Sequence, residues 1–139
     1  MIHTIVAIAF IIHGLVHLIG FVVPWRLAEV EGFAYKTTLL FGNLDVGDTG
    51  IRVVGLFWLL AAIGFVVAGV ALFTLQPWWQ VITLGVTLFS LLFCILGLPD
   101  SKFGVLINLA ILAYLFFGGD GLVGLRVRLV GLMVRLMDG

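Results

Sequence analysis

The chain has 139 residues, of which 63% are hydrophobic and only 10% are charged. A soluble domain has roughly a quarter charged residues, so this composition predicts a protein embedded in lipid rather than one that covers itself with a polar surface. Seven Lys and Arg residues balance seven Asp and Glu residues. With no basic run and no nucleic-acid-binding module, nucleic acid is not an expected partner.

Four apolar stretches are predicted to cross the bilayer, whose hydrocarbon core needs roughly 17 to 25 residues of helix. They cover residues 2–23, 51–75, 78–98 and 103–117, the last being short. The first stretch lacks a basic start, and the "PWR" that follows it is not a small-residue cleavage site, so it is expected to stay as a helix. The fold class predicted is all-α, an integral membrane four-helix bundle over residues 1–118.

The connections predict how these spans are arranged. The short links "QPWW" and "GLPDS" make neighbouring spans antiparallel, so both termini are expected on one side, here called the terminal side. The other side is the loop side, formed by the long loop 24–50. The ends of this loop read as turns, and its middle, "RLAEVEGFAYKTTLLF", is predicted to hold a short interfacial helix.

The tail, residues 119–139, is apolar apart from a few charges that include Arg126, Arg128 and Arg135. At helical spacing Arg128 and Arg135 share one narrow face, which predicts an amphipathic helix lying along the membrane interface. Two alternatives stay open: an inactive appendage that contacts a partner or lipid, and a strand, because "LRVRLV" also alternates. The basic residues favour both termini in the cytoplasm, in a bacterial-type inner membrane.

Each predicted span carries a hydrogen-bonding side chain at a similar depth below the loop side. With a rise of about 1.5 Å per residue, His17 lies roughly 9 Å deep, Asn108 roughly 8 Å and His13 roughly 15 Å. By the same measure Trp58 lies roughly 10 Å deep and Ser90 roughly 12 Å. Polar groups that face lipid are costly, so these five are expected to face one another.

Three interpretations of this polar layer remain open. Histidine, asparagine and serine can simply hold transmembrane helices together. They can instead form a ligand or redox site that opens to the loop side, with Trp25, Arg52, Asp100 and Lys102 at its mouth. The third is a metal site, because histidines at positions i and i+4 can share a metal; no third ligand is evident, so no metal is predicted.

Two local details sharpen the hypothesis. We predict that His17 hydrogen-bonds Asn108 between the first and fourth spans, with His13 one turn deeper. Gly14, beside the histidines, is expected to let a neighbouring helix come close. Cys94, the single cysteine, excludes an internal disulfide and is interpreted as a small hydrophobic residue.

The motifs "HGLVHLIGF" and "LPDSKFGVLIN" resemble those of a widespread group of uncharacterised bacterial four-helix membrane proteins, with HGxxHxxGF and DxKFGxxxN patterns. The resemblance rests on His13, Gly14, His17, Gly20 and Phe21 and on Asp100, Lys102, Phe103, Gly104 and Asn108. More distantly, the first span and "IRVVGLFWLLAAIGFVVAGVAL" look like DoxX-type membrane proteins, some of which are implicated in quinone-linked sulfur oxidation. Those proteins often carry a lysine where this chain has His17, so that role does not transfer residue by residue.

Two classes of function are consistent with the sequence. The first is a non-catalytic accessory or structural subunit, whose partners are the bilayer and other membrane proteins or a second copy of the chain. The second is a DoxX-like protein that binds a quinone or another small molecule through His13, His17 and Asn108. No cofactor is required by the motifs, and a quinone is the one candidate.

Overall fold

The structure, a computed structural model, describes residues 1–118 and 121–138 and is mostly helical. The helices are α1 (Ile2–Val16), α2 (Ile19–Val22), α3 (Gly47–Phe73), α4 (Trp79–Leu96), α5 (Lys102–Phe117) and α6 (Gly121–Met137). Two strands of two residues each, β1 (Thr38–Leu39) and β2 (Leu44–Asp45), pair antiparallel within the long loop. The predicted all-α class is confirmed.

Within the described part of the chain, three helical segments are long and apolar enough to cross a membrane: Ile2–Val22, Gly47–Phe73 and Trp79–Leu96. The last of the predicted spans corresponds to α5, which is apolar but only 16 residues long. At a rise of about 1.5 Å per residue, α5 extends about 24 Å, somewhat less than the roughly 30 Å of a bilayer core.

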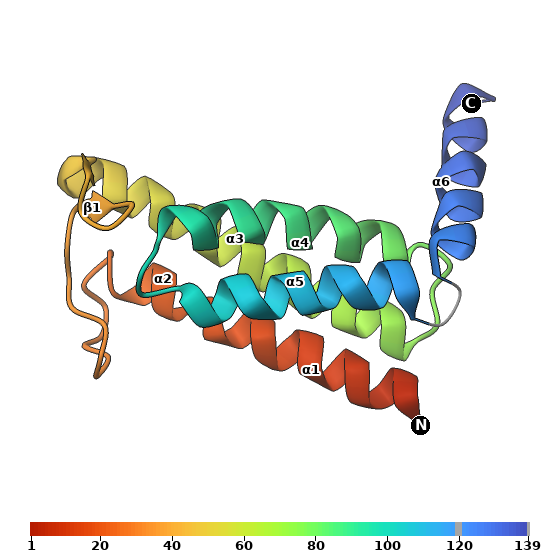
Figure 1. The fold of residues 1–139 in the computed structure, drawn as a ribbon, viewed down its shortest axis with the longest axis horizontal. Coiled ribbons are helices and arrows are strands. Elements are labelled where there is room, and N and C mark those ends of the chain that lie inside the picture. The colour runs from red at the N-terminus through yellow and green to blue at the C-terminus, as the bar shows by residue number, and fades with distance from the viewer. Residues whose placement is uncertain (119–120, 139) are drawn as a thin grey trace.

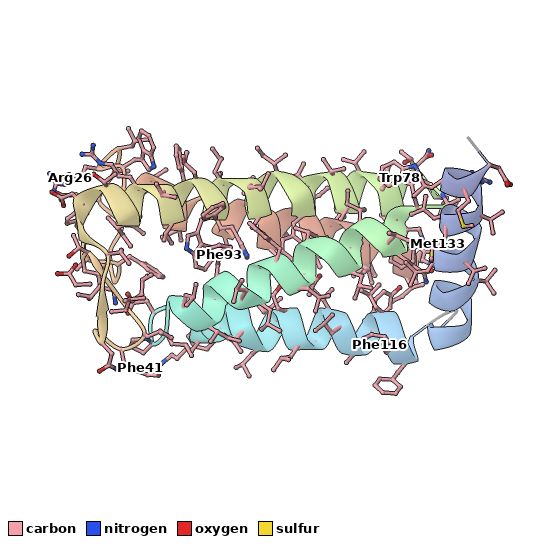
Figure 2. The ribbon with its side chains drawn as sticks, turned by 90° about the horizontal axis from the view of Figure 1, so that it is seen from above. Arg26, Phe41, Trp78, Phe93, Phe116 and Met133 are labelled. Atoms are coloured by element: carbon pink, nitrogen blue, oxygen red, sulfur yellow. The ribbon has the colours of Figure 1, made fainter. Side chains whose placement is uncertain are left out.

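The four long apolar helices run side by side, and α3 is central to their packing. It contacts α1 and α2 on one side and α4 on the other, while α4 also packs against α5 (Figure 1). The start of α1 and all of α6 lie at the same end of the bundle (Figure 1). Arg26 and Phe41 mark the opposite, loop-side end (Figure 2).

The hydrophobic core lies toward the terminal side. It is formed by buried residues from four helices, mainly Ala7, Phe10, Phe65, Ala68, Leu72, Val86, Ile111 and Leu115. Small side chains on α3 allow α1 to lie close, so that the backbones of the two helices come into contact. The loop-side half of the bundle has few members of this cluster, so other interactions must hold it together.

The long loop contains no helix between residues 24 and 46, so the short interfacial helix predicted there is wrong. Its backbone instead pairs Thr38 with Asp45 in the hairpin and bridges Val30 with Phe33. Beyond β1, the N–H groups of Leu40 and Phe41 donate to the carbonyls of Leu96 and Leu98, each at 2.8 Å. The loop is therefore fastened to the corner between α4 and α5, and these tertiary bonds override local helix propensity.

A glycine in α1 carries a testable consequence of this packing. A Cβ on Gly14 would lie 2.9 Å from the carbonyl oxygen of Ala62 and 2.9 Å from Cβ of Phe65. We expect Gly14→Ala to lower the free energy of unfolding by about 1 to 3 kcal/mol, because overpacking forces α1 and α3 apart.

Gly85→Ala is the matched control for that substitution. Gly85 is an exposed residue of α4 where an added Cβ meets nothing within 4 Å. This substitution should raise the free energy of unfolding by up to about 1 kcal/mol, because alanine has a higher helix propensity than glycine. Unfolding by denaturing detergent in mixed micelles measures both variants, and equal effects of the two changes would contradict close packing at Gly14.

Candidate functional site: a buried histidine network beside a cavity

Helix α1 ends at Val16, directly before His17. The backbone N–H of His17 bonds the carbonyl of Gly14, three residues back, instead of the carbonyl of His13. The His13 carbonyl thus loses its usual helical partner, and Nδ1 of the His17 ring lies 2.9 Å from it. The imidazole of His17 replaces the missing backbone donor.

This bond begins a chain of side-chain hydrogen bonds through α1, α4 and α5. Nε2 of His17 lies 2.5 Å from Oγ of Ser90. Nδ2 of Asn108 donates to the same Ser90 oxygen at 2.9 Å. Oδ1 of Asn108 lies 3.4 Å from Nε2 of His13, which returns the chain to α1.

The chemistry of the partners assigns a direction to each bond. A carbonyl oxygen only accepts, so His17 carries its proton on Nδ1 and accepts at Nε2. The Ser90 hydroxyl then donates to His17 and accepts from the Asn108 amide. Oδ1 of Asn108 accepts from Nε2–H of His13, which leaves Nδ1 of His13 as a bare acceptor.

All four side chains are buried. His13 is 5% exposed, His17 2%, and Ser90 and Asn108 are 0% exposed. Burying such groups without partners costs several kcal/mol each in an apolar medium, so the chain of bonds is what makes their burial tolerable. The network therefore performs on the loop side the packing role that the apolar core performs on the terminal side.

Aromatic side chains of α3 enclose the two imidazoles. The ring of Phe65 meets both histidine rings edge to face, at centroid distances of 4.6 Å for His13 and 5.4 Å for His17. Trp58 lies 5.2 Å from the His17 ring. A Cβ on Gly20 would approach Trp58 to 2.5 Å, so this glycine admits the indole as Gly14 admits Phe65. The prediction that Gly14 allows a close helix contact is confirmed.

The five residues predicted to form a polar layer do converge, but with different partners. The predicted bond between His17 and Asn108 is wrong: Asn108 pairs with His13, and His17 with Ser90. The depth estimate placed the loop-side ends of all spans at one level, whereas α5 begins inside the end marked by α3 (Figure 1). Asn108 meets His13, which lies one turn before His17 in the chain, so the estimate had placed Asn108 too shallow relative to the histidines. Trp58 joins the layer by ring contact with His17.

Cys94 is a participant that the sequence interpretation missed. Its sulfur lies 3.4 Å from Nδ2 of Asn108 and 3.8 Å from Oγ of Ser90. Gly104 of α5 leaves room for it, since a Cβ there would lie 2.7 Å from the sulfur. The i,i+4 spacing of Ser90 and Cys94 on α4 was the available signal, because it places both on one helix face.

A cavity of about 360 Å³ lies between this network and the loop. Its floor includes His13, His17 and Cys94, and the loop residues Phe33, Tyr35 and Leu39 contribute to its cover. Val16 of α1 and Ile107 of α5 also line it and are 53% and 43% exposed, so the cavity reaches the outer surface between α1 and α5.

The four residues predicted at the mouth lie in different places. Asp100 lines the cavity and forms an ion pair of 2.6 Å with Lys36, a loop residue that the sequence interpretation did not single out. The indole N–H of Trp25 donates to the carbonyl of Arg52 at 3.0 Å, which ties the end of α2 to α3. Lys102 lies over the Phe103 ring and is not part of the cavity lining.

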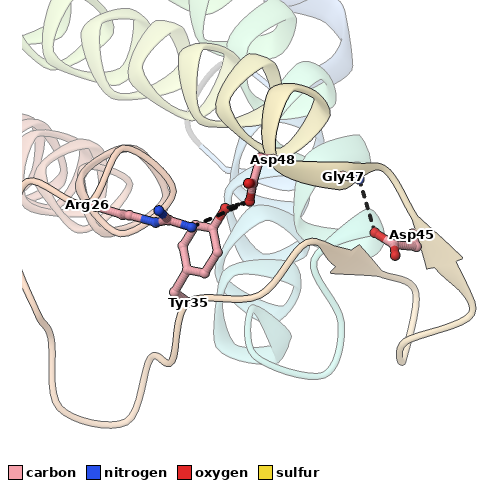
Figure 3. A network of polar contacts seen from close by, with 5 residues as sticks. All are labelled: Arg26, Tyr35, Asp45, Gly47 and Asp48. Atoms are coloured by element: carbon pink, nitrogen blue, oxygen red, sulfur yellow. Dashed lines mark hydrogen bonds and ion pairs between the residues drawn. The ribbon is translucent and has the colours of Figure 1, made fainter.

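A second cluster fastens the loop to the start of α3. Arg26 pairs with Asp48 at 3.5 Å, the hydroxyl of Tyr35 donates to the same carboxylate, and the Arg26 guanidinium covers the Tyr35 ring (Figure 3). The N–H of Gly47 donates to Asp45 at 3.0 Å. This bond, with a second from Thr37, holds the pKa of the Asp45 carboxyl below its usual value.

The described residues offer binding groups rather than a metal cage. Within residues 1–118 and 121–138, no group of three or more His, Cys, Asp or Glu side chains is arranged to hold a metal ion. Three of the four imidazole nitrogens of His13 and His17 are engaged in hydrogen bonds. The fourth nitrogen, Nδ1 of His13, is therefore the one that is still able to form a hydrogen bond.

Comparisons of the chain with protein-family models, with curated proteins and with solved structures find no match. The resemblance carried by the two sequence motifs stays a prediction.

The network predicts unequal effects for two buried hydroxyls on α4. Ser90→Ala removes the partner of both His17 and Asn108, and we expect it to lower the free energy of unfolding by about 1 to 3 kcal/mol. Thr87 is equally buried, but its hydroxyl donates only to the carbonyl of Thr83 in its own helix, at 2.6 Å. Thr87→Val should therefore cost well under half as much, and comparable losses in detergent unfolding would argue against the network.

Proposed function

We propose that this protein is a small polytopic membrane protein that binds a mostly apolar small molecule in the cavity beside His13 and His17. The observation that carries the proposal is the cavity itself, about 360 Å³ in volume with a polar floor. Ligand sites typically measure roughly 300 to 1,000 Å³ and combine apolar walls with a few polar groups. The quinone suggested by the DoxX-like resemblance belongs to this class of ligand.

The route of access supports a ligand that is dissolved in the membrane. On the loop side, the Lys36–Asp100 ion pair and the backbone bonds of Leu40 and Phe41 hold the loop over the cavity. Between α1 and α5, by contrast, the lining is apolar and half exposed at Val16 and Ile107. A molecule already in the bilayer reaches the cavity through this side without crossing a polar barrier.

The proposed membrane placement has α1 with α2, α3, α4 and α5 crossing the bilayer, both termini on the cytoplasmic side of a bacterial-type inner membrane, and α6 on its surface. Helix α6 runs across the end of the bundle rather than along it (Figures 1 and 2), and Arg135 on it is exposed. That orientation suits an interfacial helix with its cationic side toward headgroups. The side chains of Arg126 and Arg128 lie outside the described residues.

The accessory-subunit function has less specific support. Exposed apolar residues on the outer faces, such as Ile5, Ile8 and Ile12 of α1, suit contact with lipid and with another subunit equally well. The histidine network can hold the helices together in either function, but the cavity beside it has a use in the binding function and none in a purely structural one.

Reporter fusions test the proposed topology. A compartment-sensitive reporter inserted after Glu31 should report the side opposite to one fused after Asp138. Four crossings bring the end of the chain back to the side where it began, whereas the loop follows a single crossing and lies on the other side. The same compartment for both fusions would refute the four-span arrangement.

Blocking the cavity tests the binding function. Protein extracted with its surrounding lipid should retain a small amphiphile detectable by native mass spectrometry, and Ile107→Trp should remove it by filling the space between α1 and α5. Leu109→Trp is the matched control, because Leu109 is a half-exposed residue of the same helix outside the cavity lining. Equal retention by both variants, or no bound molecule in the parent protein, would count against the function.

A further inference from the structure

One buried polar atom in a residue that lines the cavity has no hydrogen-bond partner among the described residues. This atom is Nδ1 of His13, in a side chain that is 5% exposed and lines the cavity. Buried polar groups are nearly always paired, so an orphan in a cavity wall calls for an explanation.

The direction of the network decides what this nitrogen can do. Nε2 of His13 holds the ring's only proton, which it shares with Oδ1 of Asn108 at 3.4 Å. Nδ1 is then a lone pair that accepts and cannot donate. Neighbouring polar groups are already engaged: Ser90 with His17 and Asn108, and the Ser101 hydroxyl with the carbonyl of Cys94 at 2.5 Å.

We infer that the ligand of this cavity is a hydroxylated amphiphile, an alcohol, phenol or quinol, whose O–H donates to Nδ1 of His13 while its apolar body fills the space between α1 and α5. This inference rests on the proposed binding function and narrows its ligand class. A ketone, ester, ether or oxidised quinone offers oxygen acceptors only and leaves the nitrogen unpaired. The reduced, hydroxyl-bearing form of a redox pair is therefore the form that the site selects.

The geometry allows such a ligand at little cost. The bond between Nε2 of His13 and Asn108 is long, at 3.4 Å, and the torsion that turns an imidazole ring has a broad minimum. Because Nδ1 itself is buried, binding requires the ring to rotate so that this nitrogen is presented to a hydroxyl in the cavity. The walls near this floor are apolar or aromatic, including Trp58, Ile107 and Val54, so the rest of the ligand needs no further polar group.

A matched pair of probes tests the inference. 4-Hexylphenol and 1-fluoro-4-hexylbenzene have nearly the same shape, but only the phenol donates a hydrogen bond. We expect the full-length protein in lipid nanodiscs to bind the phenol about 5- to 10-fold more tightly, after correction for partitioning into protein-free nanodiscs. Ile107→Trp should abolish binding of both probes.

Nitrogen NMR of ¹⁵N-histidine-labelled protein identifies the atom. The Nδ1 resonance of His13, assigned by its loss in His13→Phe, should shift with the phenol and stay in place with the fluoro analogue, while the signals of His3 serve as a reference. Equal corrected affinities, or an unmoved His13 resonance with bound phenol, would overturn the inference and leave the binding function standing. Binding of neither probe would overturn both.

Discussion

The bond from Nδ1 of His17 to the carbonyl of His13 sets the character of the loop-side half of the molecule. It forms because α1 tightens at His17 and leaves that carbonyl without a backbone donor. Once it forms, the proton position on His17 determines the role of Ser90, then of Asn108, and then of His13. The loss of one backbone hydrogen bond in α1 therefore fixes which group donates and which accepts in each side-chain bond that links α1, α4 and α5.

The two ends of the bundle are stabilised by different interactions. At the terminal side, Phe65, Leu72 and Leu115 pack into an apolar core that needs no specific partners. At the loop side, a cavity of about 360 Å³ replaces part of that core, and cavities cost stability in proportion to their size. Hydrogen bonds of the histidine network and the fastened loop offset this cost.

Hydropathy was sufficient to predict the four long apolar helices of the bundle, and the cost of polar groups in lipid was sufficient to predict that His13, His17, Ser90 and Asn108 converge. The pairing within that group was beyond prediction, because it depends on how far each helix is displaced along its axis relative to its neighbours, which the residue count within each span does not give. The loop hairpin and the Lys36–Asp100 pair were missed because both arise from tertiary contacts with the corner between α4 and α5. The role of Cys94 was missed because a single cysteine in an apolar span is usually a small hydrophobic residue. Here its sulfur contacts the polar side chains of Ser90 and Asn108.

The imidazoles of His13 and His17 at the end of α1 are explained by their capacity to act as donor and acceptor at once without carrying charge. A network of neutral groups that begins at a backbone carbonyl, which can only accept, must pass its donors in one direction. Asn108 and Ser90 continue that direction, so the last ring in the chain, His13, ends it with an acceptor. A lysine at either histidine position would end the chain with surplus donors and a charge instead. Under the proposed binding function, the choice of histidine gives the site a neutral acceptor, which suits a hydroxyl-bearing ligand that arrives from the membrane.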